Sequence, residues 1–172
     1  MLTIQISMHI MELSGKKWGK VEIRGIRGQF STTLDDKGRM MLPAKLRAQV
    51  PMDSLVLTKS VDRCLWLFPV DHWERLVQGL SEKKSLFNDQ YQMIYRRLIA
   101  PAEEIPVDKS GRIKLFPALM KSVGLSRDCS LIGMDDHIEI WDERVYEEYE
   151  EACSQSVKEG WSNLSGMGDL GL

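Results

Sequence analysis

Hydrophobic and polar residues alternate in the first well-patterned stretch of the chain, and this alternation predicts β-strands. Phe30, Thr32 and Leu34 occupy every second position, which is the period of a strand. The run 35–38, Asp-Asp-Lys-Gly, follows and favours a tight turn, because Asp bonds neighbouring backbone and Gly accepts a positive φ angle. Residues 39–42 then resume an extended segment. The pattern predicts two strands joined by a turn.

The spacing then changes to that of a helix. Pro43 suits the first turn of a helix, and Leu46 and Val50 lie four positions apart, so we expect a helix over residues 44–50. Residues 54–58 and 64–68 are expected to form a hairpin joined at 61–63. Asp71 is placed to cap a further helix. The apolar stripe of that helix consists of Trp73, Leu76, Val77 and Leu80.

The same pattern occurs a second time, 73 positions further along the chain, and no gap is needed to align the two copies. The aligned pairs are Asp35 and Asp108, Gly38 and Gly111, Arg39 and Arg112, Leu42 and Leu115, Leu46 and Leu119, Val50 and Val123, Asp62 and Asp135, Leu65 and Ile138, Leu67 and Ile140, Phe68 and Trp141, Trp73 and Tyr146, and Glu74 and Glu147. A repeat of this length indicates two copies of one structural unit.

The repeat divides the chain into five parts. Residues 25–80 form the first unit and 100–153 the second, with a final helix expected over 142–155. Residues 81–99 connect the units through a helix that ends before Pro101. The apolar stripe of that connector is more typical of a core than of a partner site, and it consists of Tyr91, Ile94, Tyr95 and Leu98. Residues 1–24 are an N-terminal extension, and residues 154–172, rich in Gly and Ser, are expected to be a flexible tail.

A unit of about 50 residues with four or five strands buries little surface and leaves its sheet edges unpaired. Two copies in one chain solve both problems if each completes the sheet of the other. We therefore expect an α+β fold in which the two units pair as an intrachain pseudo-dimer around one shared core. That symmetry would also bring the two turns, 35–39 and 108–112, into related positions.

Composition places the chain among ordinary globular proteins, with 43% hydrophobic and 28% charged residues. It has no apolar run of spanning length and no signal-peptide pattern, so we expect a cytoplasmic protein. The net charge of −2 hides an asymmetry: residues 1–80 carry 12 Lys and Arg against 8 Asp and Glu, and residues 101–172 carry 7 against 15. A basic front permits a local anion-binding face, although two ordinary solvated surfaces explain the same counts.

The two turns carry the chemistry that points to a ligand. A Gly-containing turn brings backbone N–H groups close to an anion, and the Arg that follows offers a planar fork of donors. Arg pairs with guanine O6 and N7 in the major groove, and Lys37, Lys45 and Arg47 are available to hold phosphates. The alternative is that Asp35 and Arg39 pair across the turn and hold the hairpin closed. Spacing alone favours this structural alternative.

Several stretches resemble one family. Residues 34–47, LDDKGRMMLPAKLR, are similar to the first motif of the MraZ family, bacterial transcriptional regulators with two AbrB-type swapped-hairpin β-barrel units. Residues 108–112, DKSGR, resemble its second motif, and 64–69 and 139–143 resemble its strand and helix-entry segments. The resemblance implies a DNA-binding regulator of a cell-division and cell-wall gene cluster that acts at direct repeats in a promoter, usually its own. It also implies association with the nucleoid and ring-shaped homo-oligomers.

The resemblance assigns DNA contact to matching positions in both units. In the first unit these are Asp35, Lys37, Gly38 and Arg39, with Lys45 and Arg47 beside them, and in the second Asp108, Lys109, Gly111 and Arg112. The second unit has Ser110, Ala118 and Met120 where the first has Lys37, Lys45 and Arg47, and Lys109 and Lys114 restore part of that charge. We expect the first unit to contact DNA more heavily, and Arg39 to matter more than Arg112.

The extension 1–24 departs from the family pattern. A basic arm on DNA phosphates is one interpretation, and it would consist of Lys16, Lys17, Lys20 and Arg24. The alternative, at least as well supported, is that the start codon is wrongly assigned and that translation begins near Val21.

Other chemistry finds little support in the sequence. His9, His72 and His137 are scattered without metal-ligand spacing, and His72 is expected on the surface of its helix. Cys64, Cys129 and Cys153 form neither a disulfide framework nor a zinc pattern. Without a phosphate loop or a dinucleotide fingerprint, we expect no enzyme, cofactor or small-molecule substrate. A protein-interaction module of a larger assembly stays open as an alternative, because the acidic final helix would suit a basic partner.

Overall fold

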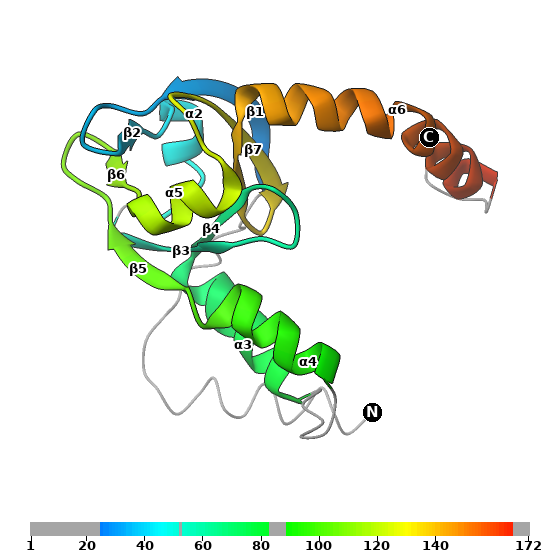
Figure 1. The fold of residues 1–172 in the computed structure, drawn as a ribbon, viewed down its shortest axis with the longest axis horizontal. Helices are drawn as coiled ribbons and strands as arrows, with labels where there is room; N and C mark the ends of the chain where they lie inside the picture. The colour runs from blue at the N-terminus through cyan, green and yellow to red at the C-terminus, as the bar shows by residue number, and fades with distance from the viewer. Residues whose placement is uncertain (1–24, 52, 83–88, 167–172) are drawn as a thin grey trace, which may run out of the picture.

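The computed structural model describes residues 25–51, 53–82 and 89–166. Six antiparallel strands form one sheet in the order β1-β7-β8-β4-β3-β5, and two short strands form a separate ribbon, β2-β6 (Figure 1). The strands of the sheet are β1 (Ile26–Thr33), β3 (Ser54–Lys59), β4 (Leu65–Pro69), β5 (Glu103–Pro106), β7 (Asp128–Asp135) and β8 (Ile138–Asp142). The ribbon consists of β2 (Arg39–Met41) and β6 (Arg112–Lys114).

The strand order shows the pairing of units that the repeat predicts. β1 of the first unit pairs with β7 of the second, and β5 of the second pairs with β3 of the first. β4 and β8, which are related by the repeat, pair with each other at the centre of the sheet. The order of strands therefore maps onto itself when the units are exchanged. The expectation that each unit completes the sheet of the other is confirmed.

The closed β-barrel implied by the family resemblance does not form. Among the described residues the six-stranded sheet is open, with β1 and β5 at its two edges, and the ribbon β2-β6 is a separate sheet that packs on it through the core. Each edge strand pairs on its inner side with a strand of the opposite unit, so the exchange joins the two units into one sheet without closing a barrel.

The gapless alignment of the two units fails at one strand. Thr32 and Ile105 are related by the shift of 73, but their partners, Cys129 and Leu55, are 74 positions apart. In β8 the shift is 73 again, because the pairing of β4 with β8 is symmetric. Leu65 pairs with Ile140, and Ile138, the counterpart of Leu65, pairs with Leu67, the counterpart of Ile140. One residue is therefore gained before β7 and lost in the turn that follows it. Because a one-residue change flips every side chain of a strand, this offset is what puts Cys129 and Leu131 in the core.

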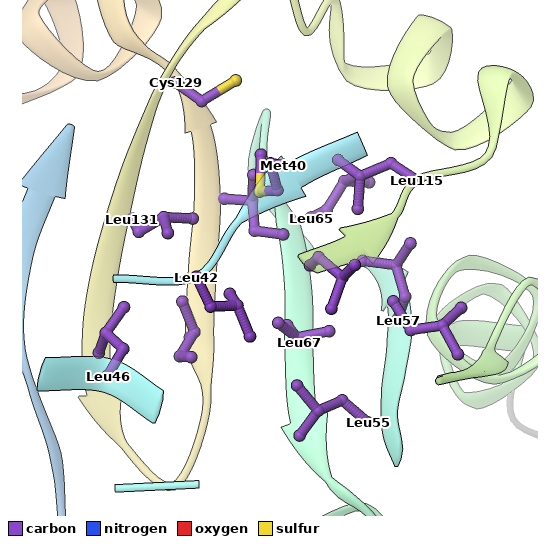
Figure 2. Close-up of a cluster of buried hydrophobic side chains, with 14 of the residues drawn as sticks. Met40, Leu42, Leu46, Leu55, Leu57, Leu65, Leu67, Leu115, Cys129 and Leu131 are labelled. Carbon is purple, nitrogen blue, oxygen red and sulfur yellow. The ribbon is translucent and has the colours of Figure 1, made fainter. Parts of the chain in front are cut away.

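Two short helices cover one face of the sheet and complete the core. They are α2 (Ala44–Arg47), which ends before the predicted residue 50, and α5 (Pro117–Val123), which ends at Gly124 with φ 72°. Figure 2 shows Met40, Leu42 and Leu115, from the ribbon and its flanks, facing Leu57, Leu65 and Leu67 of the sheet. All six side chains are at most 1% exposed, and the core draws on both units. The shared core predicted from the repeat is confirmed.

The opposite face of the sheet is covered by the remaining helices. These are α3 (Val70–Glu82), α4 (Asp89–Ile94) with the π-helical turn η1 (Tyr95–Ile99), and α6 (Glu143–Gly166), which contributes its first turns, where Tyr146 and Tyr149 pack on Trp141. Aromatic pairs repeat the internal symmetry here: the rings of Phe68 and Trp73 are 5.6 Å apart, and those of their counterparts Trp141 and Tyr146 are 5.7 Å apart. The connector stripe expected in the core is divided: Tyr91 and Leu98 are buried, whereas Ile94 and Tyr95 are exposed.

Helix α6 extends away from the rest of the chain (Figure 1). It continues to Gly166, past the predicted end at residue 155, so the expectation of a flexible tail from residue 154 is wrong as far as Gly166. The N-terminal extension 1–24, His9 and residues 167–172 lie outside the described residues.

Candidate nucleic-acid interface

The two Asp-x-x-Gly-Arg turns have the same backbone geometry. Asp35 Oδ1 accepts hydrogen bonds from the backbone N–H groups of Lys37 and Arg39, both at 2.9 Å. Asp108 Oδ1 accepts the equivalent bonds from Ser110 and Arg112, at 2.8 and 2.9 Å. In each turn the Gly N–H also donates to the Asp carbonyl. The motif Asp is therefore first a structural residue, which closes the turn that leads into the ribbon.

Each motif Gly also receives a side chain from the opposite unit. Gly38 and Gly111 have φ angles of 72° and 80°, which other residues rarely adopt. A Cβ on Gly111 would lie 2.4 Å from Cδ of Arg47, and a Cβ on Gly38 would lie 3.3 Å from Cε of Met120. Arg47 and Met120 are themselves related by the repeat. Each turn therefore packs against a side chain from the short helix of the other unit.

This packing predicts a difference between two Gly→Ala variants. Gly111→Ala should lower the free energy of unfolding by about 1–2 kcal/mol, because Ala at positive φ is strained and its methyl would displace Arg47. Gly79→Ala is the control: Gly79 lies within α3 with nothing within 4 Å of its Cβ position, so the same change should raise stability by about 0.5–1 kcal/mol. Urea denaturation of both variants measures this, and equal shifts would contradict the proposed packing.

Arg39 and Asp35 form the ion pair that spacing alone favoured. Nε and Nη2 of Arg39 lie 2.8 and 2.7 Å from Asp35 Oδ2, and both side chains are half-buried. This bond, together with the backbone N–H donors, lowers the pKa of Asp35 to about 2, and it raises the pKa of Arg39. Within the part of the chain that the structure describes, Nη1 of Arg39 has no hydrogen-bond partner, so the pair orients the guanidinium and leaves one edge free.

The second turn differs in this respect. Asp108 has a lowered pKa, chiefly through the backbone N–H of Arg112, but the Arg112 side chain makes no ion pair with it and is exposed. The two turns also interact electrostatically, because the negative charge of Asp108 contributes to raising the pKa of Arg39. Arg39 is held in place, and Arg112 is free to move.

The antiparallel register of the ribbon sorts its side chains into two faces. Arg39 lies opposite Lys114, and Met41 lies opposite Arg112, while Met40 and Ile113 between them are 1% exposed and point into the core. The outer face therefore presents two Arg, one Lys and one Met. Sequence reasoning counted Lys114 only toward the charge of the second unit, and it did not place Met41 at the site. Strand alternation about Met40 would have found both.

The flanking basic residues predicted for the site separate into two groups. Lys37, Lys45 and Lys109 are exposed. Arg47 is not free: its Nη1 donates to the Ser110 carbonyl at 3.3 Å, its stem packs over Gly111, and its Nε is buried without a partner among the described residues. Arg47 joins the two units, and the structure does not present it as a surface cation.

The expectation that His72 lies on the surface is wrong. His72 is 9% exposed, and its Nδ1 lies 2.7 Å from the carbonyl oxygen of Asp136 in the β7–β8 turn. His137, from the same turn, stacks on Phe68 with ring centroids 4.8 Å apart. Cys64 and Cys129 are buried, and burial raises the pKa of each thiol to about 12, so neither is a thiolate at neutral pH. No group of metal-binding side chains occurs within residues 25–51, 53–82 and 89–166.

His137 makes stability depend on pH. Its Nδ1 lies 2.6 Å from Asp136 Oδ1, and its Nε2 lies 3.8 Å from Glu139 Oε1. Burial opposes the charged imidazole, but the two carboxylates outweigh burial and raise the pKa of His137 above 6.5. A raised folded-state pKa stabilises the fold fully below the unfolded value, and this stabilisation is lost as pH rises through the folded value.

The free energy of unfolding should therefore fall as pH is raised from about 6 through the raised pKa of His137, and His137→Gln should flatten that slope. Urea denaturation of both proteins over that range tests this. Wild-type stability that is constant or rising across the range would show that the imidazolium is not stabilised.

Taken together, the fold and this surface define a class: a two-unit α+β protein with internal pseudo-symmetry that presents a basic two-stranded ribbon. The sequence model of the MraZ protein family, described as antitoxin-like, matches residues 26–97 and 98–163. The protein named Transcriptional regulator MraZ of Treponema denticola is 42% identical over 141 residues, which cover 82% of this chain and 98% of that protein. The chain belongs to the MraZ family.

Further relatives share the name. Transcriptional regulator MraZ of Treponema pallidum is 36% identical over 147 residues, covering 86% of this chain and 99% of that protein, and the Limosilactobacillus fermentum protein is 34% identical over 140 residues, covering 81% and 96%. These names describe regulators of transcription and not enzymes, as expected from the sequence. Within the described residues no helix has the length and apolar character needed to cross a membrane.

Proposed function

We propose that this protein is a DNA-binding regulator of transcription and that the outer face of ribbon β2-β6 contacts the DNA. The observation that carries the proposal is the register of the ribbon, which turns Arg39, Arg112 and Lys114 outward on one face. The names of the relatives support the regulatory role. The buried Met40 and Ile113 fix the ribbon on the shared core, so the three cations are carried on a rigid element.

A two-stranded ribbon is an element that the major groove of B-DNA admits. In that position Arg39 and Arg112 reach base edges, where a guanidinium pairs with guanine O6 and N7. The exposed Lys37, Lys45 and Lys109 lie at the turns and on α2, where they would neutralise phosphates on either side. The Asp35 carboxylate orients Arg39 before DNA arrives, which lowers the entropy lost on binding and supports a larger role for Arg39 than for Arg112.

The finer parts of the proposal follow the family resemblance. The exchange of strands between units is of the AbrB swapped-hairpin kind, and the protein acts in the cytoplasm on the nucleoid. It binds direct repeats in the promoter of a cell-division and cell-wall gene cluster, its own gene included. One ribbon offers few base contacts, so a ring of several copies on successive repeats raises the effective concentration of each site and makes a modest single-site affinity sufficient.

A gel-shift titration with the DNA upstream of the protein's own gene tests the proposal. The protein should retard this fragment at lower concentration than a scrambled fragment of the same length, and binding should weaken steeply as salt rises, because phosphate contacts release counterions. Equal retardation of both fragments, or none of either, would contradict sequence-specific binding and favour an interaction module without DNA readout.

A further inference from the structure

The outer face of ribbon β2-β6 is not symmetric, although the fold around it has internal pseudo-symmetry. The repeat relates Arg39 to Arg112, so this position is the same in both halves of the face. It relates Met41 to Lys114, so one half carries an apolar side chain where the other carries a cation. Met41 is 37% exposed, and among the residues of the ribbon it is the one apolar side chain that points outward. The two halves of the face therefore differ in chemistry at one position.

Met41 lies directly beside Arg112 and is held there. The two residues are partners across the ribbon, and a backbone hydrogen bond falls on the next pair, where the Leu42 N–H donates to the Gly111 carbonyl at 3.0 Å. Side chains of the pairs between such bonds lie closest, with Cβ atoms about 4.5–5.5 Å apart. The Thr32 hydroxyl donates to the Met41 carbonyl at 3.1 Å, which attaches this end of β2 to β1. Met41 is therefore presented at a defined place beside an Arg of the proposed DNA contact.

The major groove offers an apolar side chain one kind of partner. Base edges there present hydrogen-bond donors and acceptors, and the C5 methyl of thymine is the apolar group among them. The Met41 side chain has no N–H or O–H to donate and no charge to attract a phosphate, and its flexible thioether adapts to an irregular apolar surface. On a face that otherwise carries cations, Met41 is matched to a thymine methyl.

We propose that Met41 is a specificity-determining residue that contacts the C5 methyl of a thymine within about two base pairs of the guanine that Arg112 reads. The distance follows from the ribbon, because a Cβ separation of about 5 Å corresponds to about one and a half base-pair steps of about 3.4 Å. Lys114, at the related position beside Arg39, offers a charge and hydrogen-bond donors and makes no equivalent contact. The inference rests on the ribbon contact in the proposed function and adds a base to it.

The difference between Met41 and Lys114 gives the DNA site a direction. A ribbon with two identical halves would read a palindrome, because the symmetry of a site mirrors the symmetry of the protein. With a thymine methyl read by one half only, each copy binds its site in a single orientation. Copies on successive direct repeats then all face the same way, as the repeats in the proposed function require.

Uracil interference on the upstream DNA tests this contact. Deoxyuridine lacks only the C5 methyl of thymidine, so partial replacement shows which methyl groups binding requires. In the wild type, replacing one thymine per repeat should weaken binding about three- to fivefold, the effect of one buried methyl group. That thymine should lie on the same side of the N7-sensitive guanines in every repeat.

Met41→Ala should lose affinity for the natural repeat by a similar factor and should lose the sensitivity to uracil, while guanine N7 methylation still blocks its binding. Fluorescence anisotropy on single-repeat duplexes, with thymine or uracil at the mapped position, measures both proteins. Met134→Ala is the matched control. Met134 is 45% exposed in β7, outside the ribbon, so the same truncation should leave affinity and uracil sensitivity unchanged.

Three results would overturn the contact. They are a wild type with no uracil-sensitive thymine near the N7-sensitive guanines, a uracil sensitivity that Met41→Ala keeps, and a sensitive thymine that changes sides between repeats. The wild-type pattern tests the contact without any variant. Wild-type protein that shows neither specific retardation nor N7 sensitivity would overturn the proposed function and the contact with it, so the two failures give different results.

Discussion

Replacing Arg39 and Arg112 together by Ala should lower the affinity for the upstream DNA about 30-fold or more at constant salt. Each Arg that pairs with guanine contributes about 1–3 kcal/mol of discrimination, and the double variant removes two such pairs. Both side chains lie on the outer face of the ribbon, so the core is untouched. Of the single variants, Arg39→Ala should lose more affinity, because Asp35 holds its guanidinium in place. Fluorescence anisotropy with a labelled repeat measures all three.

Arg144→Ala provides the control for this experiment. Arg144 is an exposed cation at the start of α6, away from the ribbon, and its loss makes the same change in net charge as either single variant. It should leave the affinity within about twofold. Equal losses for Arg144→Ala and Arg112→Ala would mean that the overall charge governs binding and not the ribbon.

Leu65→Ala should destabilise both units together, by about 2–5 kcal/mol. Leu65 is fully buried in β4, at the central pairing of the sheet where it faces Ile140 of the second unit. Because the two units share one core, unfolding should stay a single transition with a lower midpoint.

Met134→Ala is the comparison for Leu65→Ala, since Met134 is 45% exposed, and it should cost less than about 1 kcal/mol. Urea denaturation followed by tryptophan fluorescence and by circular dichroism distinguishes the outcomes. Two separate transitions in Leu65→Ala, one at the wild-type midpoint, would show that the second unit folds without the first.

The sequence predicted the local elements and their duplication well. Alternation located β1 and β2, and the repeat predicted that Leu65 and Leu67 would have the same role as Ile138 and Ile140, all of which are buried in one core. These predictions succeed because the spacing of apolar residues along a strand or helix depends only on residues that are close in the sequence. The register offset in β7 was not predicted, because a residue gained before a strand and lost after it leaves the remaining alignment unchanged.

Predictions failed where a long-range contact determines the outcome. Arg47 was expected to be a surface cation, but it packs on Gly111, 64 positions away, and His72 is buried by the distant β7–β8 turn. Neither partner can be identified from local spacing. The motif Asp was open to a structural and a functional interpretation, and the geometry gives it the structural role of orienting Arg39.

Methylation interference on the upstream DNA tests the central claim most directly. Methylating guanine N7 blocks the acceptor that an Arg in the major groove uses. If the β2-β6 ribbon reads the repeats, methylation of guanines in each repeat should abolish wild-type binding, and the Arg39→Ala/Arg112→Ala variant should lose that sensitivity. Wild-type binding that is indifferent to N7 methylation throughout the repeats would contradict the account.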